Sequence, residues 1–251
     1  MILLELMLGF GIGVSLGLLG GGGSILTVPA LVYLVGQTPQ AAVTTSLAIV
    51  GANSLMGAML HRAQGTLDWK VALTFGSAGM LASYLSASIS NHLAPAVLLA
   101  IFALLMLTIG IMLFFRRNQN ETEVAYSAKP IMLVLASGTG VGFLTGLLGV
   151  GGGFLVVPAL VMLVGLPIQV AMGTSLVVIA MTSTAGFLGH AGSGAFDPIM
   201  AMIFITAGLV GTFTGTKLSS RMSSSKLQRA FAWFVVTLAL FLLYDNLPKI
   251  F

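Results

Sequence analysis

The chain has few charged residues and no cysteine. Only 6% of its 251 residues are charged, whereas 57% are hydrophobic. A soluble domain carries about 25% charged residues, and a chain with so few cannot cover a water-facing surface. Most of its surface must therefore face lipid, and its apolar runs exceed the roughly 20 residues that a membrane span requires. The absence of cysteine excludes disulfides, thiol catalysis and cysteine-ligated metal sites.

Two common enzyme motifs are also missing, and the usual ligands of a metal site are scarce. The sequence has no His-Glu-x-x-His motif and no phosphate-binding loop. With three histidines and no cysteine, a structural metal site is not expected. We therefore predict a protein that is not an enzyme, without metal or cofactor. The net charge of +4 comes from basic residues in short loops beside apolar spans, where they set orientation, so nucleic-acid binding is not predicted.

The sequence repeats itself at an offset of 129 residues (158 − 29). The run Gly20-Gly-Gly-Gly-Ser-Ile-Leu-Thr-Val-Pro29-Ala-Leu31 returns as Gly149-Val-Gly-Gly-Gly-Phe-Leu-Val-Val-Pro158-Ala-Leu160. The offset holds without a gap from Gly9 to Asp68, with about 28 identities in these 60 positions (68 − 9 + 1). A duplicated hydrophobic half with glycine breaks at matching positions indicates a transporter built from structural repeats, with its site at the breaks.

Each half is predicted to form five helices, because lipid tolerates only helices or closed barrels and no segment has the alternation of a barrel strand. The expected helices are 2–19, 24–35, 39–60, 69–89 and 93–115, then 131–148, 153–164, 168–189, 198–218 and 226–244. Residues 1–115 and 130–251 are thus two membrane repeats, joined by the polar linker 116–129. The predicted fold class is an all-α polytopic membrane protein with eight to ten helical segments.

The second helix of each half is too short to span a membrane. About 12 residues form a helix of about 18 Å, whereas the hydrocarbon core is roughly 30 Å thick. Each short helix follows a run of glycines and contains a proline. We therefore predict that the first two helices of each half form a hairpin whose glycine turn lies inside the protein, where irregular backbone is tolerated at membrane depth.

The charges of the loops predict opposite orientations for the two halves. The positive-inside rule places the loop with Arg62 and Lys70, the linker 116–129 and the basic region 217–229 in the cytoplasm. The loop at His190 lacks lysine and arginine and lies outside. Equivalent loops then lie on opposite sides, which predicts inverted repeats with both termini external. Three spans plus a hairpin, or five full spans, both fit.

The glycine breaks allow a packing interpretation and a binding interpretation. Small residues let membrane helices approach closely. Alternatively, helices that begin at Ser24 and Gly153 present free N–H groups and positive dipole ends to an anion. Two such ends can converge near the midplane of an inverted pair. The candidate substrate-binding residues at the breaks are Gly22, Gly23, Ser24, Gly151, Gly152 and Gly153.

A polar stripe follows on the third helix of each half. Its spacings of seven and eight residues place the side chains on one helical face. Hydroxyls and amides can bind a small oxyanion without a fixed charge, or they can satisfy helix–helix hydrogen bonds worth about 0.6–2 kcal/mol each. The candidate substrate-binding residues of the stripe are Thr45, Ser46 and Asn53, with Thr174, Ser175 and Thr182 at the repeat positions.

Two pairs of titratable residues also repeat. Asp68 precedes Trp69 and Asp197 precedes Pro198, as N-cap residues precede a helix. We predict capping for both aspartates. His61 and His190 suggest a proton relay, but in inverted repeats they lie at opposite membrane faces and cannot form one site. We therefore predict an interfacial role for the histidines.

The two glycine blocks, followed by Ala41-Ala-Val-Thr-Thr-Ser46 and Met172-Gly-Thr-Ser175, resemble the TauE/SafE family of sulfite exporters over essentially the whole chain. The resemblance implies a permease of the cell inner membrane for small sulfur-containing anions, often an exporter, without specifying one substrate. Within the chain, Val150 replaces Gly21 and Gly153 replaces Ser24 at equivalent positions. The two breaks are therefore not chemically equivalent.

We predict a transporter that exports sulfite or organosulfonates by alternating access, with one repeat moving against the other. The site lies between the glycine breaks and the Thr-Ser pairs. The expected partners are a small anionic substrate and the lipid bilayer. Two alternatives fit the same residues: a permease for another small solute or oxyanion, and a membrane accessory factor without flux of its own.

The predicted topology can be tested by cysteine labelling, because the native chain supplies no background thiol. Cysteines introduced at Ser127 and Ser193 should react with an impermeant thiol reagent from opposite sides of the membrane. Labelling of both from the same side would contradict the inverted arrangement.

Overall fold

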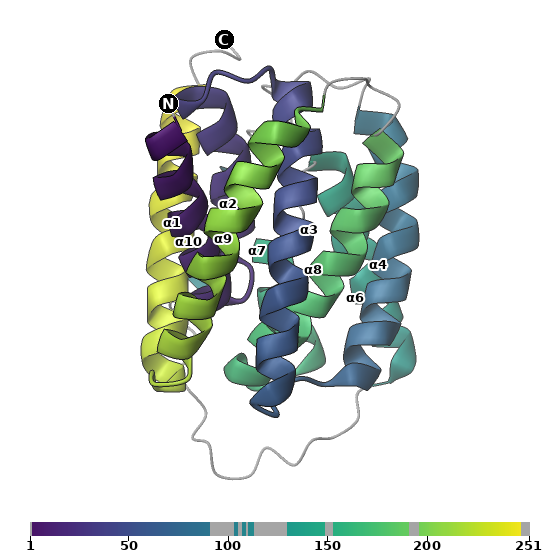
Figure 1. The fold of residues 1–251 in the computed structure, drawn as a ribbon. Coiled ribbons are helices and arrows are strands. Elements are labelled where there is room, and N and C mark those ends of the chain that lie inside the picture. Colours follow the sequence, from purple (N-terminus) through teal and green to yellow (C-terminus); the bar gives the residue numbers. More distant parts are fainter. Residues whose placement is uncertain are drawn as a thin grey trace.

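The computed structural model describes residues 2–90, 103–104, 107–108, 110–112, 130–148, 153–190 and 196–246. Within these residues the chain forms helices and no strand (Figure 1). The predicted fold class of an all-α protein is therefore confirmed. The expected helix 93–115 lies mostly outside the described residues, and the linker 116–129 lies entirely outside them.

The observed helices follow the predicted order. In the first half they are α1 Ile2–Leu19, α2 Gly22–Pro29, the π-helix η1 Ala30–Leu34, α3 Pro39–Ala63 and α4 Trp69–Ser90. In the second half they are α6 Ile131–Leu148, α7 Gly153–Ala159, the π-helix η2 Leu160–Val164, α8 Ile168–His190, α9 Pro198–Ser219 and α10 Ser224–Asn246.

Four of the described helices are long and apolar enough to cross a membrane: Ile2–Leu19, Gln40–Ala63, Ile168–His190 and Pro198–Ser219. Their outer faces carry large apolar side chains. Leu3 and Ile199, for example, are 73% and 74% exposed. Such side chains are unfavourable in water but suit a lipid environment. This pattern supports the predicted polytopic membrane protein.

The short second helix departs from the prediction in two ways. α2 begins at Gly22, two residues before the expected start, and it becomes π-helical after Pro29. Proline has no N–H to continue the α-helical ladder, and Val35 N–H then donates to the Ala30 carbonyl at 3.1 Å, five residues back. A π-helix also follows Pro158 in the second half.

Both aspartates cap helices as predicted. The Asp68 carboxylate accepts a hydrogen bond from Val71 N–H at 2.9 Å. The Asp197 carboxylate accepts from Ile199 N–H at 3.0 Å and from Met200 N–H at 3.1 Å, with Pro198 opening α9. These side chains satisfy N–H groups that have no partner within the first turn of a helix.

Glycines allow two helix pairs to touch backbone to backbone. On α1 and α9, a Cβ at Gly13 would lie 2.8 Å from Gly208 Cα. On α4 and α6, a Cβ at Gly142 would lie 2.6 Å from the Gly79 carbonyl carbon. These two contacts stand at equivalent positions of the repeat. Each pair joins one helix of the first half to one helix of the second.

The order of the contacts gives the direction of each helix. Along α1 and α9, Gly9 faces Phe204, Gly13 faces Gly208 and Gly17 faces Thr212, so the two helices are parallel. Asn53 of α3 faces Gly208 and Gly57 faces Thr212, so α3 runs with them. We call α1, α3 and α9 the first helix group.

The second helix group consists of α4, α6 and α8. Gly138 faces Phe75 and Gly142 faces Gly79, so α6 and α4 are parallel, and the contacts of Gly76 with Val178 and of Gly79 with Thr182 align α8 with them. Between the groups, α3 and α8 are antiparallel, because Leu47 faces Gly186 whereas Gly57 faces Leu176. Figure 1 shows the two groups beside each other.

Basic side chains gather at one end of the bundle. The parallel helices α3 and α9 end there, and α4 and α10 begin there (Figure 1). Arg62, Lys70, Lys217 and Arg221 occupy this end and are all exposed. The start of α1 and the end of α10 lie at the opposite end (Figure 1).

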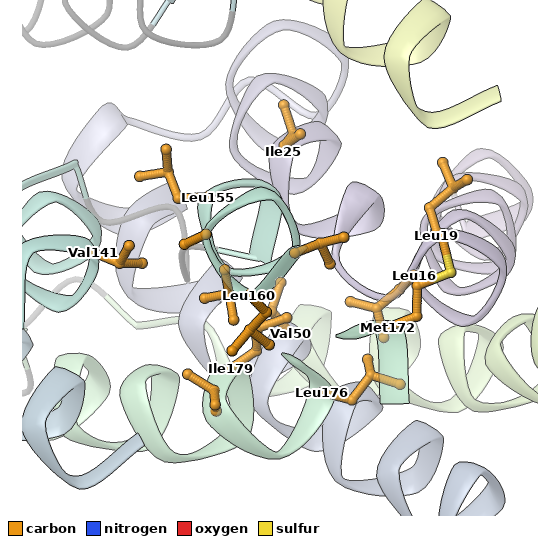
Figure 2. Packing of buried hydrophobic residues seen from close by; sticks show 14 of the residues in the cluster. Leu16, Leu19, Ile25, Val50, Val141, Leu155, Leu160, Met172, Leu176 and Ile179 are labelled. Atoms are coloured by element: carbon orange, nitrogen blue, oxygen red, sulfur yellow. The ribbon is translucent and has the colours of Figure 1, made fainter. Parts of the chain in front are cut away.

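An aliphatic core fills the space between the groups. Figure 2 shows Leu16 and Leu19 of α1, Ile25 of α2 and Leu160 of η2 in one cluster with side chains of α3 and α8. The short helices of both hairpins thus lie in the interior, where Leu16, Ile25 and Leu160 are fully buried.

The glycine contacts predict a sharp difference between two neighbouring substitutions. Gly13→Ala should lower the thermal unfolding midpoint in detergent, because the added methyl meets the α9 backbone and overpacking typically costs about 1–3 kcal/mol. Gly11→Ala is the matched control, since a Cβ there meets nothing within 4 Å. Equal midpoints for the two variants would contradict the observed packing of α1 on α9.

Candidate functional site

Gly153, the last residue of the second glycine run, meets the first glycine break inside the protein. A Cβ at Gly21 would lie 2.6 Å from the Gly153 carbonyl carbon, and a Cβ at Gly153 would lie 2.6 Å from the Gly21 carbonyl oxygen. Gly20 has φ +66°, a left-handed conformation that favours glycine. The structure therefore brings the start of α7 directly against the residue before α2.

Hydroxyl groups hold the first break in place. Ser24 Oγ donates to the Gly21 carbonyl at 2.8 Å. Ser175 Oγ of α8 lies in hydrogen-bond contact with the Gly20 carbonyl and donates to the Met172 carbonyl at 2.7 Å. The first break, from one half of the chain, thus contacts Ser175 of the other half.

The structure gives the other candidate residues different surroundings. Thr174 Oγ1 accepts a hydrogen bond from Asp68 N–H at 3.0 Å. Ser46 Oγ donates to the Val43 carbonyl at 2.8 Å. Thr45 Oγ1 is buried and has no hydrogen-bond partner in the described part of the chain. Of the glycines, Gly22 opens α2 and Gly23 packs on the Ile12 carbonyl, whereas Gly151 and Gly152 lie outside the described residues.

Asn53 and Thr182 face a neighbouring helix of their own group. The Asn53 amide carbon would lie 2.9 Å from a Cβ at Gly208 of α9. Thr182 stands at the equivalent contact, with its methyl 3.2 Å from a Cβ at Gly79 of α4, and its hydroxyl donates to the Val178 carbonyl at 3.0 Å. The Asn53 amide, in contrast, has no hydrogen-bond partner among the described residues.

Two further buried polar residues were missed by the sequence analysis. Thr212 and Thr216 of α9 are 0% and 1% exposed, and neither hydroxyl has a partner in the described chain. Their repeat equivalents are Ser83 and Ala87, so duplication did not single them out. The available signal was the run Gly211-Thr-Phe-Thr-Gly-Thr216, which is unusually rich in hydroxyls for an apolar helix.

The histidines lie at the ends of antiparallel helices and do not come together. His61, at the end of α3, is 3% exposed, and its Nδ1 lies 2.8 Å from Thr66 Oγ1. His190, at the end of α8, is 8% exposed, and its Nδ1 lies 2.9 Å from the Gly186 carbonyl oxygen. Both rings are more buried than an interfacial role implies.

The described residues form neither a cluster of metal ligands nor the active-site turn of a serine hydrolase. No group of three His, Asp or Glu side chains could hold a metal ion there. The run Gly13-Val-Ser-Leu-Gly17 matches the Gly-x-Ser-x-Gly pattern of serine hydrolases, but it lies inside α1 against α9. A nucleophile elbow requires a strand-to-helix turn, so the match has no catalytic context.

A bundle of membrane-spanning helices with two broken hairpins meeting in its interior defines the chain as a polytopic membrane protein of the transporter class. Comparison with known families specifies it further. The model of the family "Sulfite exporter TauE/SafE" matches residues 5–242. The chain therefore belongs to the TauE/SafE family.

Similar proteins carry transporter names. A "Probable membrane transporter protein" of Xylella fastidiosa (strain 9a5c) is 35% identical over 244 residues, which cover 94% of this chain and 92% of the relative. The "Probable membrane transporter protein YunE" of Bacillus subtilis (strain 168) is 28% identical, with 92% and 93% of the two chains covered. Comparison with solved structures gave no significant match.

Proposed function

We propose that this protein exports small sulfur-containing anions, such as sulfite or organosulfonates, by alternating access at a site between the two glycine breaks. The observation that carries the proposal is the buried contact of Gly21 with Gly153, with Ser175 against Gly20. Irregular backbone at membrane depth is expected only inside the protein or along a substrate cavity. Membership of the TauE/SafE family supports a transported solute.

An anionic cargo fits the chemistry of this region. α2 begins at Gly22 without a side-chain cap, so the positive end of its dipole remains available to a negative ligand. No lysine or arginine is buried among the described residues. Dipoles and hydroxyls would then hold the anion without a fixed countercharge, which favours release. Export of an anion from a negative-inside cell gains roughly 2.3 kcal/mol per charge per 100 mV.

The halves are proposed to form inverted repeats, but the moving units are proposed to be the two helix groups. The equivalent helices α3 and α8 run in opposite directions, which supports inversion. Moving one sequence half against the other would break the backbone contacts of α1 with α9 and of α4 with α6. Along the middle of α3 and α8, in contrast, Gly57 meets the side chain of Leu176, and Gly186 meets that of Leu47. Side-chain contacts of this kind can slide at lower cost. The backbone contacts between the groups lie at the helix ends, where Gly20 meets Met172.

The proposed orientation follows from the charges. The end of the bundle that carries Arg62, Lys70, Lys217 and Arg221 faces the cytoplasm, as the positive-inside rule requires. The N-terminal end of α1 and the C-terminal end of α10 are then external, in the cell inner membrane.

Flux measurements test the cargo and the site together. Purified protein in liposomes should show saturable flux of labelled sulfite, with sulfate, taurine and sulfoacetate as competitors. Thr45→Val should reduce this flux about ten-fold or more, because a hydrogen bond to a charged ligand is worth about 1.5–3 kcal/mol. Thr45 is the repeat equivalent of Thr174, whose neighbour Ser175 contacts the first break.

The neighbouring Thr44→Val is the matched control for this measurement. Thr44 is equally buried, but its hydroxyl donates to the Gln40 carbonyl at 3.1 Å. Its flux should remain close to that of the native chain. Equal losses in both variants would remove Thr45 from the site. Absence of sulfite flux in folded, inserted protein would favour another solute or an accessory role.

Engineered disulfides test which units move. Gly51→Cys with Ser183→Cys joins the two groups, since a Cβ at Gly51 would lie 3.4 Å from Ser183 Cβ. Oxidation should stop transport, and reduction should restore it. Labelled sulfoacetate is the appropriate cargo, because sulfite cleaves disulfides.

The control disulfide lies within the first helix group. Gly9→Cys with Ala207→Cys joins α1 to α9, where a Cβ at Gly9 would lie 3.1 Å from Ala207 Cβ. Both distances are near the 3.5–4.5 Å range of Cβ atoms in disulfides. Transport should survive oxidation of this pair. Loss of transport on oxidation of both pairs would instead make the sequence halves the moving units, because each pair joins one half to the other.

A further inference from the structure

Three parallel helices of the first group meet along a seam of glycines and buried polar side chains. α1 contributes Gly13 and Gly17, α3 contributes Asn53 and Gly57, and α9 contributes Gly208, Thr212 and Thr216. We call this set of seven residues the polar seam. On α9 its residues are spaced by four, so they lie on one face of the helix.

The polar side chains of the seam point into it. A Cβ at Gly208 would lie 2.9 Å from the Asn53 amide carbon, and a Cβ at Gly17 would lie 2.9 Å from Thr216 Oγ1. The Thr212 methyl would lie 3.3 Å from a Cβ at Gly57. The missing glycine side chains therefore leave these polar groups against bare backbone.

The hydrogen-bonding capacity of the seam is unused. Asn53 Oδ1 and Nδ2, Thr212 Oγ1 and Thr216 Oγ1 have no hydrogen-bond partner among the described residues. All three side chains are at least 99% buried. A buried polar group without a partner is costly and rare in native proteins.

Apart from Thr45, the other buried threonines of the described helices do not share this property. Four of them donate to a carbonyl three or four residues earlier in their own helix, the usual solution for a helical threonine. They are Thr27, Thr44, Thr145 and Thr182. Helix geometry alone therefore does not explain the free hydroxyls of Thr212 and Thr216.

The equivalent seam of the second group is fully paired. There, Thr182 replaces Asn53 and Ser83 replaces Thr212. Thr182 Oγ1 donates to the Val178 carbonyl at 3.0 Å, and Ser83 Oγ donates to the Thr182 carbonyl at 3.5 Å. The backbones pack in the same way in both seams, as the contact of Gly142 with Gly79 shows. Packing can thus be achieved without unpaired polar atoms.

The seam also connects the middle of the bundle with the first glycine break. Asn53 and Gly208 lie midway along α3 and α9. Thr216 lies beside Gly17, three residues before the first glycine break, and next to the exposed Lys217 in the chain. The row of polar groups thus leads from the middle of the bundle to the level of the first break, toward the basic end, whose positive charge attracts anions.

We propose that the polar seam is a binding surface for the transported anion beside the first glycine break, uncovered when the second helix group moves and withdraws Leu176 from Gly57 and Thr212. The inference rests on the proposed transport of a small anion. The Asn53 amide and the hydroxyls of Thr212 and Thr216 donate hydrogen bonds to the oxygens of a sulfite or sulfonate group. The paired seam of α4, α6 and α8 remains a packing contact.

Substituted-cysteine accessibility tests this assignment without requiring flux. The variants Thr212→Cys and Thr216→Cys are compared with Ser83→Cys, which occupies the position equivalent to Thr212. The probe is 2-sulfonatoethyl methanethiosulfonate, a small impermeant sulfonate, applied to vesicles of either orientation. Both seam cysteines should react from the side of the α3–α4 turn, at least about ten-fold faster than Ser83→Cys, because buried thiols are inert. Sulfoacetate should slow the reaction.

Rates for the seam cysteines no faster than for Ser83→Cys would overturn the proposal, and labelling that sulfoacetate does not slow would overturn the binding of an anion. Monodisperse elution establishes that each variant is folded, and thiol titration in SDS establishes that its cysteine is present and reduced. If Thr212→Cys does not fold, Thr216→Cys near the end of α9 provides the same comparison. Labelling with sulfoacetate protection but without sulfite flux would reject sulfite as the cargo and leave the seam assignment intact.

Discussion

The contact of bare glycine backbones between α1 and α9, and again between α4 and α6, is the constraint on which the rest of the structure depends. Where a Cβ at Gly13 would lie 2.8 Å from Gly208 Cα, no other residue fits. Without a hydrophobic driving force between helices in lipid, such close packing is a main source of association. Because each contact joins a helix of one half to a helix of the other, it fixes two three-helix groups that differ from the two halves of the sequence.

The glycine breaks depend on this packing of helices from one half against helices from the other. The first break rests on α8 through Met172 and Ser175, and its Gly21 meets Gly153 at the start of α7. A break built from one half is therefore completed by the other half. An aliphatic core surrounds both short helices (Figure 2). The irregular backbone is thereby kept away from lipid, where its unpaired N–H and C=O groups would be costly.

Neutral groups dominate the interior. Among the described residues the buried polar side chains are mainly Ser and Thr, and no lysine or arginine is buried. The hydroxyls of Ser24, Ser175 and Thr174 form hydrogen bonds within the protein, as the packing interpretation of these positions expects. Thr45, Asn53, Thr212 and Thr216 retain unused capacity. A site of this kind would bind an anion through dipoles, with modest affinity, as a transporter that must release its cargo requires.

The sequence by itself determined the helical membrane fold, the duplicated halves, the helix boundaries to within a few residues and the capping by Asp68 and Asp197. Hydrophobicity, periodicity and N-cap chemistry act locally and can be read along one chain. Only the tertiary structure decided which hydroxyls form hydrogen bonds within the protein and which helices pack together. Ser175 and Thr182 look alike in sequence, yet one bonds to a glycine break and the other to its own helix. Only the tertiary structure shows that the Thr212 hydroxyl is buried without a partner, beside Gly57. This state depends on neighbours that are distant in the chain.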